Sequence, residues 1–101
     1  MTEHVSKSIW IGKSAYMHLD RESRKQRGCK KLSPEAEDRL WKRVTVHSKN
    51  RMYRATDNSF GGGDGTYDGR WWAWSVDELK RMLDKAGLKY KSGKEIRYIN
   101  L

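Results

Sequence analysis

The chain has 101 residues and carries 22 Lys and Arg against 13 Asp and Glu, which gives a net charge of +9 at pH 7. The single cysteine, Cys29, excludes an internal disulfide, and the lack of a long apolar run argues against a membrane span. We therefore expect one cytoplasmic domain, residues 1–101, with anionic partners and no membrane association. The apolar share of 36% predicts a small core, for which five Trp and five Tyr compensate in part.

The N-terminal half predicts a strand followed by a helix. Residues 1–7 are polar and are expected to be loose. Residues 8–19 alternate as a strand does, with an interruption that suggests a bulge or a hairpin turn. Residues 20–31 are charged and predict either a solvated loop or a short basic helix. Ser33 then caps a helix predicted over residues 34–47, with a proline at its first position.

The middle of the chain combines flexibility with aromatic residues. Residues 51–56 alternate and predict a short strand. Residues 57–69 hold five glycines and several polar residues, and they predict a mobile loop. The loop lacks the specific phosphate-binding and calcium-binding patterns, so a surface connection is the favoured interpretation. Residues 70–74 contain three Trp and predict a strand, because aromatic residues favour the pleated surface.

The best-marked helix is predicted over residues 76–86. Ser75 and Glu78 match the capping box, in which a serine N-cap is followed three positions later by a glutamate. Apolar residues recur at helical spacing, and Gly87 stands where a C-terminal capping glycine belongs. The start and the end of this helix are therefore both predicted from local chemistry.

Two further strands, residues 88–90 and 95–99, are predicted to be joined across residues 91–94. The resulting order, β-α-β-β-α-β-β, favours an α+β fold. This fold is a small, mainly antiparallel sheet with two helices packed on one face, in a single domain.

A competing interpretation concerns the C-terminal third alone. Residues 75–80, 85–88 and 92–94 resemble the start of a SAP-type DNA-binding helix pair. The resemblance implies a second helix over residues 95–101, where the alternation predicts a strand.

Positive charge is concentrated between residues 20 and 54, which hold twelve Lys or Arg and five Asp or Glu. Such a segment is either solvated surface or an arm that binds phosphates, and an exposed aromatic residue beside it can stack a base. The residues predicted to bind nucleic acid are Arg21, Arg24, Lys25, Arg27, Lys30, Lys31, Arg51, Arg54, Arg70 and Trp72.

These features predict a small basic protein that binds DNA or RNA without catalysis, cofactor or metal. The three histidines and one cysteine lack ligand spacing, and no nucleophile motif is present. One alternative is a protein-directed inhibitor or adaptor of a larger nucleic-acid-processing enzyme, because Trp, Tyr and Arg also dominate protein interfaces. A second alternative is a small metal-independent ribonuclease, whose acid, base and cations would come from Tyr16, His18, His47, Arg51 and Arg54.

Overall fold

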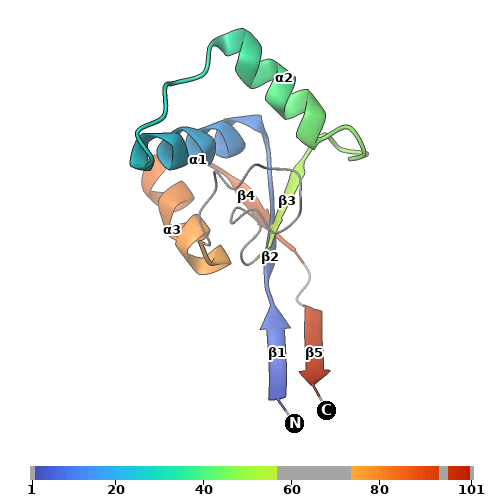
Figure 1. Ribbon diagram of the computed structural model, residues 1–101. Coiled ribbons are helices and arrows are strands. Elements are labelled where there is room, and N and C mark those ends of the chain that lie inside the picture. Colours follow the sequence, from blue (N-terminus) through green and yellow to red (C-terminus); the bar gives the residue numbers. More distant parts are fainter. Residues whose placement is uncertain (1, 57–73, 94–95, 101) are drawn as a thin grey trace.

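The computed structural model describes residues 2–56, 74–93 and 96–100 (Figure 1). The elements in this part of the chain are β1 (Thr2–Ser6), β2 (Ser8–Ile11), α1 (Lys13–Gln26), α2 (Pro34–Val44), β3 (Tyr53–Thr56), α3 (Val76–Ala86), β4 (Tyr90–Ser92) and β5 (Ile96–Asn100). All the strand pairs among them are antiparallel. The predicted α+β class is confirmed, although the described residues form three helices where the sequence predicted two.

The larger sheet has β2 at its centre, with β3 and β4 on either side. Ile9 and Ile11 of β2 are completely buried, and their register partners in β3, Ala55 and Tyr53, are buried with them. Successive side chains of a strand point to opposite faces, so Trp10 lies on the other side of the sheet. The face of this sheet that carries Ile9 and Ile11 therefore packs in the core, and the opposite face carries Trp10.

Helix α1 corrects the prediction of a strand over residues 8–19. The strand ends at Ile11, and Gly12 forms the N-cap of α1, where its carbonyl accepts the Tyr16 N–H at 3.0 Å. The buried face of α1 includes polar as well as apolar side chains at helical spacing, namely Tyr16, Leu19, Asp20, Ser23 and Arg24. The sequence predicted a strand because only the apolar residues resemble core residues, and these alternate as in a strand. The buried polar residues, which complete the helical stripe, resemble solvent-exposed residues in the sequence. Of the two interpretations of residues 20–31, the helix is correct up to Gln26.

Helix α2 begins as predicted, and it ends earlier than predicted. The Ser33 hydroxyl accepts the Ala36 N–H at 3.2 Å, which satisfies one of the free donors of the first turn. The helix stops at Val44, three residues before the predicted end at residue 47. The Thr45 hydroxyl donates to the Trp41 carbonyl at 2.7 Å, a side-chain bond that competes with continuation of the helix.

Helix α3 has the predicted bounds. The Ser75 hydroxyl accepts the Glu78 N–H at 3.2 Å, and Gly87 adopts the left-handed conformation (φ 71°) that ends the helix. Leu79 and Leu83 are completely buried. Loss of the Ser75 cap would cost about 1 kcal/mol.

Strands β1 and β5 form a separate two-stranded ribbon, which extends away from the helices and carries both termini at its tip (Figure 1). Two strands exist near the C-terminus, but β4 overlaps the predicted strand 88–90 only at Tyr90 and continues into the predicted connection. Strand β4 pairs with β2 and β5 pairs with β1, so the two do not pair with each other. Residues 2–6, where a loose segment was expected, form β1. The helix implied by the SAP resemblance is also wrong, because residues 96–100 are a strand.

The β1–β5 pairing and the β2–β4 pairing are offset from each other by one residue. Gly93 lies at this offset, and its N–H donates to the Ser8 carbonyl at 2.8 Å. A Cβ atom at residue 93 would overlap the Ser8 hydroxyl. A side chain at residue 93 would therefore force Ser8 to shift, and glycine avoids this clash.

Tyr16 connects three elements at the centre of the core. Its ring lies 5.6 Å from that of Trp41 in α2 and 5.0 Å from that of Tyr53 in β3, measured between centroids. Trp74, which precedes α3 in the sequence, is partly buried and also packs against this core. The mobile loop predicted over residues 57–69 and the strand predicted over residues 70–74 lie outside the described residues, apart from Trp74 itself.

Candidate nucleic-acid interface

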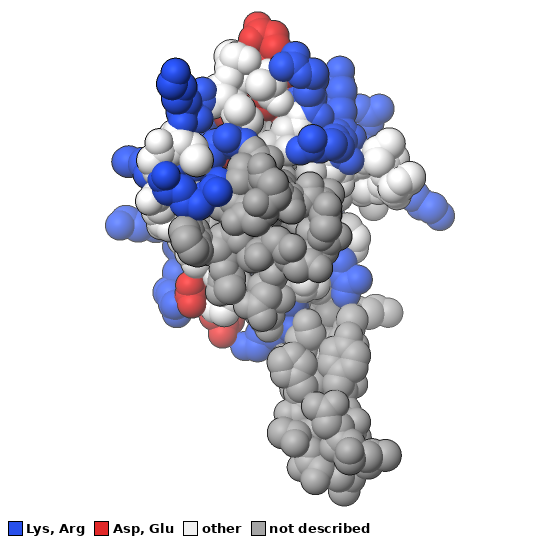
Figure 2. All heavy atoms as spheres, in the orientation of Figure 1, with Lys and Arg blue, Asp and Glu red and all other residues white. Residues whose placement is uncertain are grey.

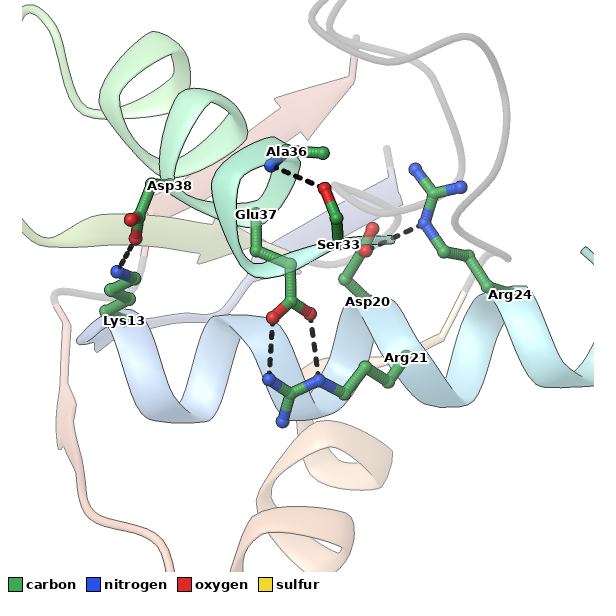
Figure 3. A network of polar contacts seen from close by, with 8 residues as sticks. All are labelled: Lys13, Asp20, Arg21, Arg24, Ser33, Ala36, Glu37 and Asp38. Atoms are coloured by element: carbon green, nitrogen blue, oxygen red, sulfur yellow. Dashed lines mark hydrogen bonds and ion pairs between the residues drawn. The ribbon is translucent and has the colours of Figure 1, made fainter. Parts of the chain in front are cut away.

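Arg21, the first cation of the predicted phosphate-binding arm, is paired with a carboxylate. Its Nε and Nη2 atoms donate to the two Glu37 oxygens at 2.8 Å each, so the pair is bidentate (Figure 3). The hydrogen bond from Arg21 holds the pKa of Glu37 below its usual range against the opposing effect of burial, and it raises the pKa of Arg21. This pair joins α1 to α2, and the Arg21 side chain is still about half exposed.

The ion pair formed by Arg24 is more deeply buried than that of Arg21. Its Nε atom lies 2.9 Å from Asp20 Oδ2, one turn earlier on α1, and the two side chains are only 10% and 1% exposed (Figure 3). A guanidinium with so little exposed surface has lost most of its contact with solvent. The structure therefore places Arg24 largely in the interior of the fold, in an ion pair with Asp20.

A third ion pair lies along the same helix contact. Lys13 at the start of α1 donates to Asp38 of α2, and this hydrogen bond lowers the pKa of Asp38 (Figure 3). Together with the Arg21–Glu37 and Arg24–Asp20 pairs, it makes this region the α1–α2 ion-pair cluster. Arg21 and Arg24, which the sequence predicted to be available for phosphate binding, are neutralised here by carboxylates from both helices.

The remaining cations of the predicted arm differ from one another. Lys25, Lys30 and Lys31 are exposed, at the C-terminal end of α1 and in the connection to α2. Arg27 is half-buried, and its Nε and Nη2 atoms are buried without a hydrogen-bond partner. Four of the six predicted arm residues are therefore exposed, and three of these, Lys25, Lys30 and Lys31, form no ion pair with a carboxylate among the described residues.

A second group of cations surrounds a cavity of about 660 Å³ beside the outer face of the larger sheet. Arg43 comes from α2, Lys49 from the turn that follows it, Arg54 from β3 and Lys91 from β4. The described residues of the lining include no Asp or Glu, and the apolar ones among them include Trp10 and Val46. We call this site the cationic cavity. None of its four Lys and Arg residues forms an ion pair with a carboxylate of the described chain.

The strand register explains how the floor of the cavity forms. Arg54 and Lys91 are the partners of Trp10 in the neighbouring strands, so the three lie in one row across the sheet. The two cations are exposed and Trp10 is half-buried. Side chains directly opposite each other in paired strands are about 5 Å apart at Cβ, so each cation lies beside the indole.

The turn between α2 and β3 forms the rim. Its backbone is held by the Ser48 hydroxyl, which accepts the Met52 N–H at 3.1 Å. Arg51 adopts a left-handed conformation (φ 50°), which is unfavourable for a residue with a side chain. Figure 2 shows Lys and Arg side chains gathered over α2 and this turn.

The structure therefore divides the predicted site residues into separate groups. Arg54 lines the cationic cavity, and Arg51 is exposed on the adjoining turn. Arg70 and Trp72 lie outside the described residues. The sequence did not predict a binding role for the other principal residues of the cavity, which are Trp10, Arg43, Lys49 and Lys91. Strand alternation around Ile9 and Ile11 was the one signal that could have identified Trp10.

Of the residues named for a ribonuclease, His47 and Arg54 line the cationic cavity, and Tyr16 and His18 lie elsewhere. Tyr16 is completely buried in the core, so its ring is not accessible to a substrate. His47 lines the cationic cavity, whereas His18 lines a different one between α1, α2 and the end of α3. In the described part of the chain, no three His, Cys, Asp or Glu residues are grouped so as to hold a metal ion.

Two further findings bear on the class of protein. None of the helices in the described ranges is both long enough and apolar enough to cross a membrane. No protein-family model, curated protein or solved structure matches this chain.

Proposed function

We propose that the protein binds nucleic acid at the cationic cavity and catalyses no reaction. One observation carries the proposal: four Lys and Arg residues from four segments surround one hollow, and no acidic residue is among the described residues that line it. Bringing like charges together without counter-charges costs free energy in the isolated protein, and a bound polyanion removes that cost.

The kinds of cation present fit a phosphate backbone. Arg43 and Arg54 each offer a planar fork of N–H donors that matches two phosphate oxygens, and Lys49 and Lys91 offer mobile point charges. Because the four come from separate elements, they surround a ligand from several sides. A flexible chain with a charge at every unit can reach them in turn, and each contact releases counter-ions.

The exposed part of the predicted arm is a different surface. The C-terminal end of α1 and the turn after α2 lie on opposite sides of the molecule in Figure 1. Lys25, Lys30 and Lys31, at and after that end of α1, are not among the residues that line the cavity. They provide a matched control, because the same number of charges can be removed at either place.

The test compares two double variants that each remove two positive charges. The cavity variant is Arg54→Gln with Lys91→Gln, and the control is Lys25→Gln with Lys30→Gln. Retention of labelled single-stranded and duplex oligonucleotides is measured as a function of salt. We expect the cavity variant to lose most of the affinity and to reduce the log–log salt slope by about 1.4 on single strands, or 0.7 for each lost contact. The control is expected to change the affinity much less.

Other results would contradict the proposal in distinct ways. Equal losses in the two variants would mean that net charge alone attracts the oligonucleotide. No retention by the wild-type protein at low salt would remove direct binding, and partners captured in a nuclease-resistant pull-down would then support the protein-directed alternative. RNA cleavage that is lost in His47→Ala would support the ribonuclease.

A further inference from the structure

The outer face of the larger sheet has one aromatic side chain among its described residues, and it lies between two cations. Trp10 belongs to β2, the central strand, which is paired on both sides. The ring of Tyr16 contacts those of Trp41 and Tyr53 in the core, and Trp10 takes part in neither contact. An indole held on a central strand, outside the core and beside a hollow, is a fixed platform for a planar ligand.

The lining of the cavity includes further apolar side chains besides Trp10. Val46 lies in the turn after α2 and is 68% exposed, which makes it the one large hydrophobic side chain counted as exposed among the described residues. Val44 and Met52 line the same hollow. The volume of about 660 Å³ lies within the range of roughly 300–1,000 Å³ that is typical of small-ligand sites. A site for phosphate alone has no need of this apolar lining.

We propose that the cationic cavity takes an unpaired nucleobase, stacked on Trp10, with the neighbouring phosphates on Arg54 and Lys91. This inference rests on the proposed function and names the form of nucleic acid that the site selects, which is a single strand. Bases in a duplex are stacked on each other and paired, so their faces cannot reach an indole inside a cavity. Bases in a single strand can leave the stack at little cost and lie on an aromatic ring.

The register of the sheet gives this arrangement its geometry. The row Arg54–Trp10–Lys91 alternates charge, aromatic ring and charge, as a single strand alternates phosphate, base and phosphate. Asn50, exposed in the turn that lines the cavity, supplies an amide near the expected base edge. Every base has a π face, so stacking on Trp10 gives strand preference and little sequence preference.

The test uses three fluorescein-labelled probes of equal length at one salt concentration. They are a single-stranded DNA, the same strand in a duplex, and a single strand of abasic sites with the same number of phosphates. The proteins are the wild type, Trp10→Ala, Trp10→Phe and the Arg54→Gln/Lys91→Gln double variant. Thermal melting of each protein checks that it folds.

We expect the wild-type protein to bind the single strand more tightly than the duplex, and the abasic strand about 5-fold to 100-fold more weakly than the normal strand. Trp10→Ala should weaken single-strand binding by a similar factor and remove the difference between normal and abasic strands, with the salt slope unchanged. Trp10→Phe should recover part of the affinity, because a smaller aromatic ring still stacks.

The comparison with abasic DNA needs only the wild-type protein, so it decides the matter even where Trp10→Ala fails to fold. Equal binding of normal and abasic strands would overturn the stacking proposal, and so would equal affinity for single strand and duplex. If one of these results is obtained and binding is still lost in Arg54→Gln/Lys91→Gln, the stacking proposal fails and the proposed function stands. Absence of binding to all three probes would overturn both proposals together.

Discussion

The α1–α2 ion-pair cluster and the cationic cavity use the same kinds of side chain for opposite purposes. In the cluster, Arg21 and Arg24 each have a carboxylate within hydrogen-bonding distance, and Asp20 and Glu37 are buried by the contact. In the cavity, Arg54 and Lys91 are exposed and lie on either side of an indole, and the hollow has no acidic residue among the lining residues that the structure describes. Positive charge alone therefore does not indicate a binding site, because the position of the carboxylates decides which cations remain available.

This difference has an energetic consequence that mutations can test. Cations paired with buried carboxylates contribute to folding stability, and removing either partner leaves the other without compensation. Cations gathered without acids repel one another weakly, and removing them leaves the stability almost unchanged. Substitutions in the cluster should therefore affect unfolding, and substitutions in the cavity should affect ligand binding.

The largest effect is expected at the buried Asp20–Arg24 pair. Asp20→Ala leaves the Arg24 guanidinium buried without its carboxylate, and we expect the free energy of unfolding to fall by about 3–5 kcal/mol. Urea denaturation measures the change. The double variant Asp20→Leu/Arg24→Met removes both charges and should recover most of the loss. A decrease of less than 1 kcal/mol in Asp20→Ala would show that solvent reaches Arg24 easily.

The next effect concerns Glu37, whose pKa is lowered in the folded protein by its bond to Arg21. A lowered pKa means that the stabilisation is present above the ordinary pKa of 4.5 and is lost as the pH falls below it. Glu37→Gln should reduce stability at pH 7 by about 1–2 kcal/mol, near the low end for a charged hydrogen bond because Arg21 is half exposed.

Denaturation of Glu37→Gln and wild type between pH 7 and pH 2.5 measures this dependence. The difference in the free energy of unfolding should shrink as the pH falls below 4.5, because protonation removes the carboxylate charge from the wild type as well. A difference that stays constant with pH would mean that the Arg21–Glu37 pair owes its effect to packing and not to charge.

A smaller effect of opposite sign is expected at Arg51, on the rim of the cavity. Its left-handed backbone (φ 50°) is unfavourable for arginine and easily adopted by glycine, so Arg51→Gly should raise the free energy of unfolding by about 0.5–1 kcal/mol. Arg51→Ala removes the same charge without relieving the backbone and is the control. Arg51 is not among the residues that line the cavity, so either change should weaken oligonucleotide binding less than Arg54→Gln does. Equal melting temperatures for the glycine and alanine variants would argue against strain in this turn.

The double variant in the cationic cavity is expected to change stability least, although it should weaken oligonucleotide binding most. Arg54→Gln/Lys91→Gln should unfold within about 0.5 kcal/mol of the wild type, as exposed substitutions without partners do. Denaturation and oligonucleotide retention on the same preparation test both parts of the statement. A loss of more than 1 kcal/mol would show that these cations are structural, and the contrast with the ion-pair cluster would no longer hold.

Local signals in the sequence identified α2 and α3 well. The caps of these helices depend on residues three positions apart, Ser33 with Ala36 and Ser75 with Glu78. Such contacts form within a single turn, so no distant part of the chain is needed to predict them. The left-handed Gly87 ends α3 for a reason that is equally local.

The prediction of α1 failed because its buried face depends on partners elsewhere in the chain. Asp20 and Arg24 are buried as a pair, and Ser23 is buried beside them. Polarity alone assigned these positions to solvent. The strand prediction for residues 8–19 followed the apolar residues only, and these satisfied strand spacing as well as they satisfied helix spacing.

The candidate site was predicted only in part. Arg54, one of the residues predicted to bind nucleic acid, lines the cationic cavity, whereas Arg21 and Arg24 were counted as available although carboxylates hold them. Trp10, Arg43, Lys49 and Lys91 come from four separate segments. No spacing in the sequence connects them, because only the folded sheet and the turn after α2 bring them together.

The amino-acid order by itself determined the α+β class, the starts of α2 and α3 and the excess of positive charge, since these follow from composition and from contacts within a turn. Tertiary structure decided which cations are neutralised and which remain available. Arg21 lies 16 residues from the Glu37 that binds it, and Lys91 is placed beside Trp10 only by the pairing of β2 with β4. Electrostatic attraction acts over a few ångströms of space, so separation along the chain does not reveal which charges meet.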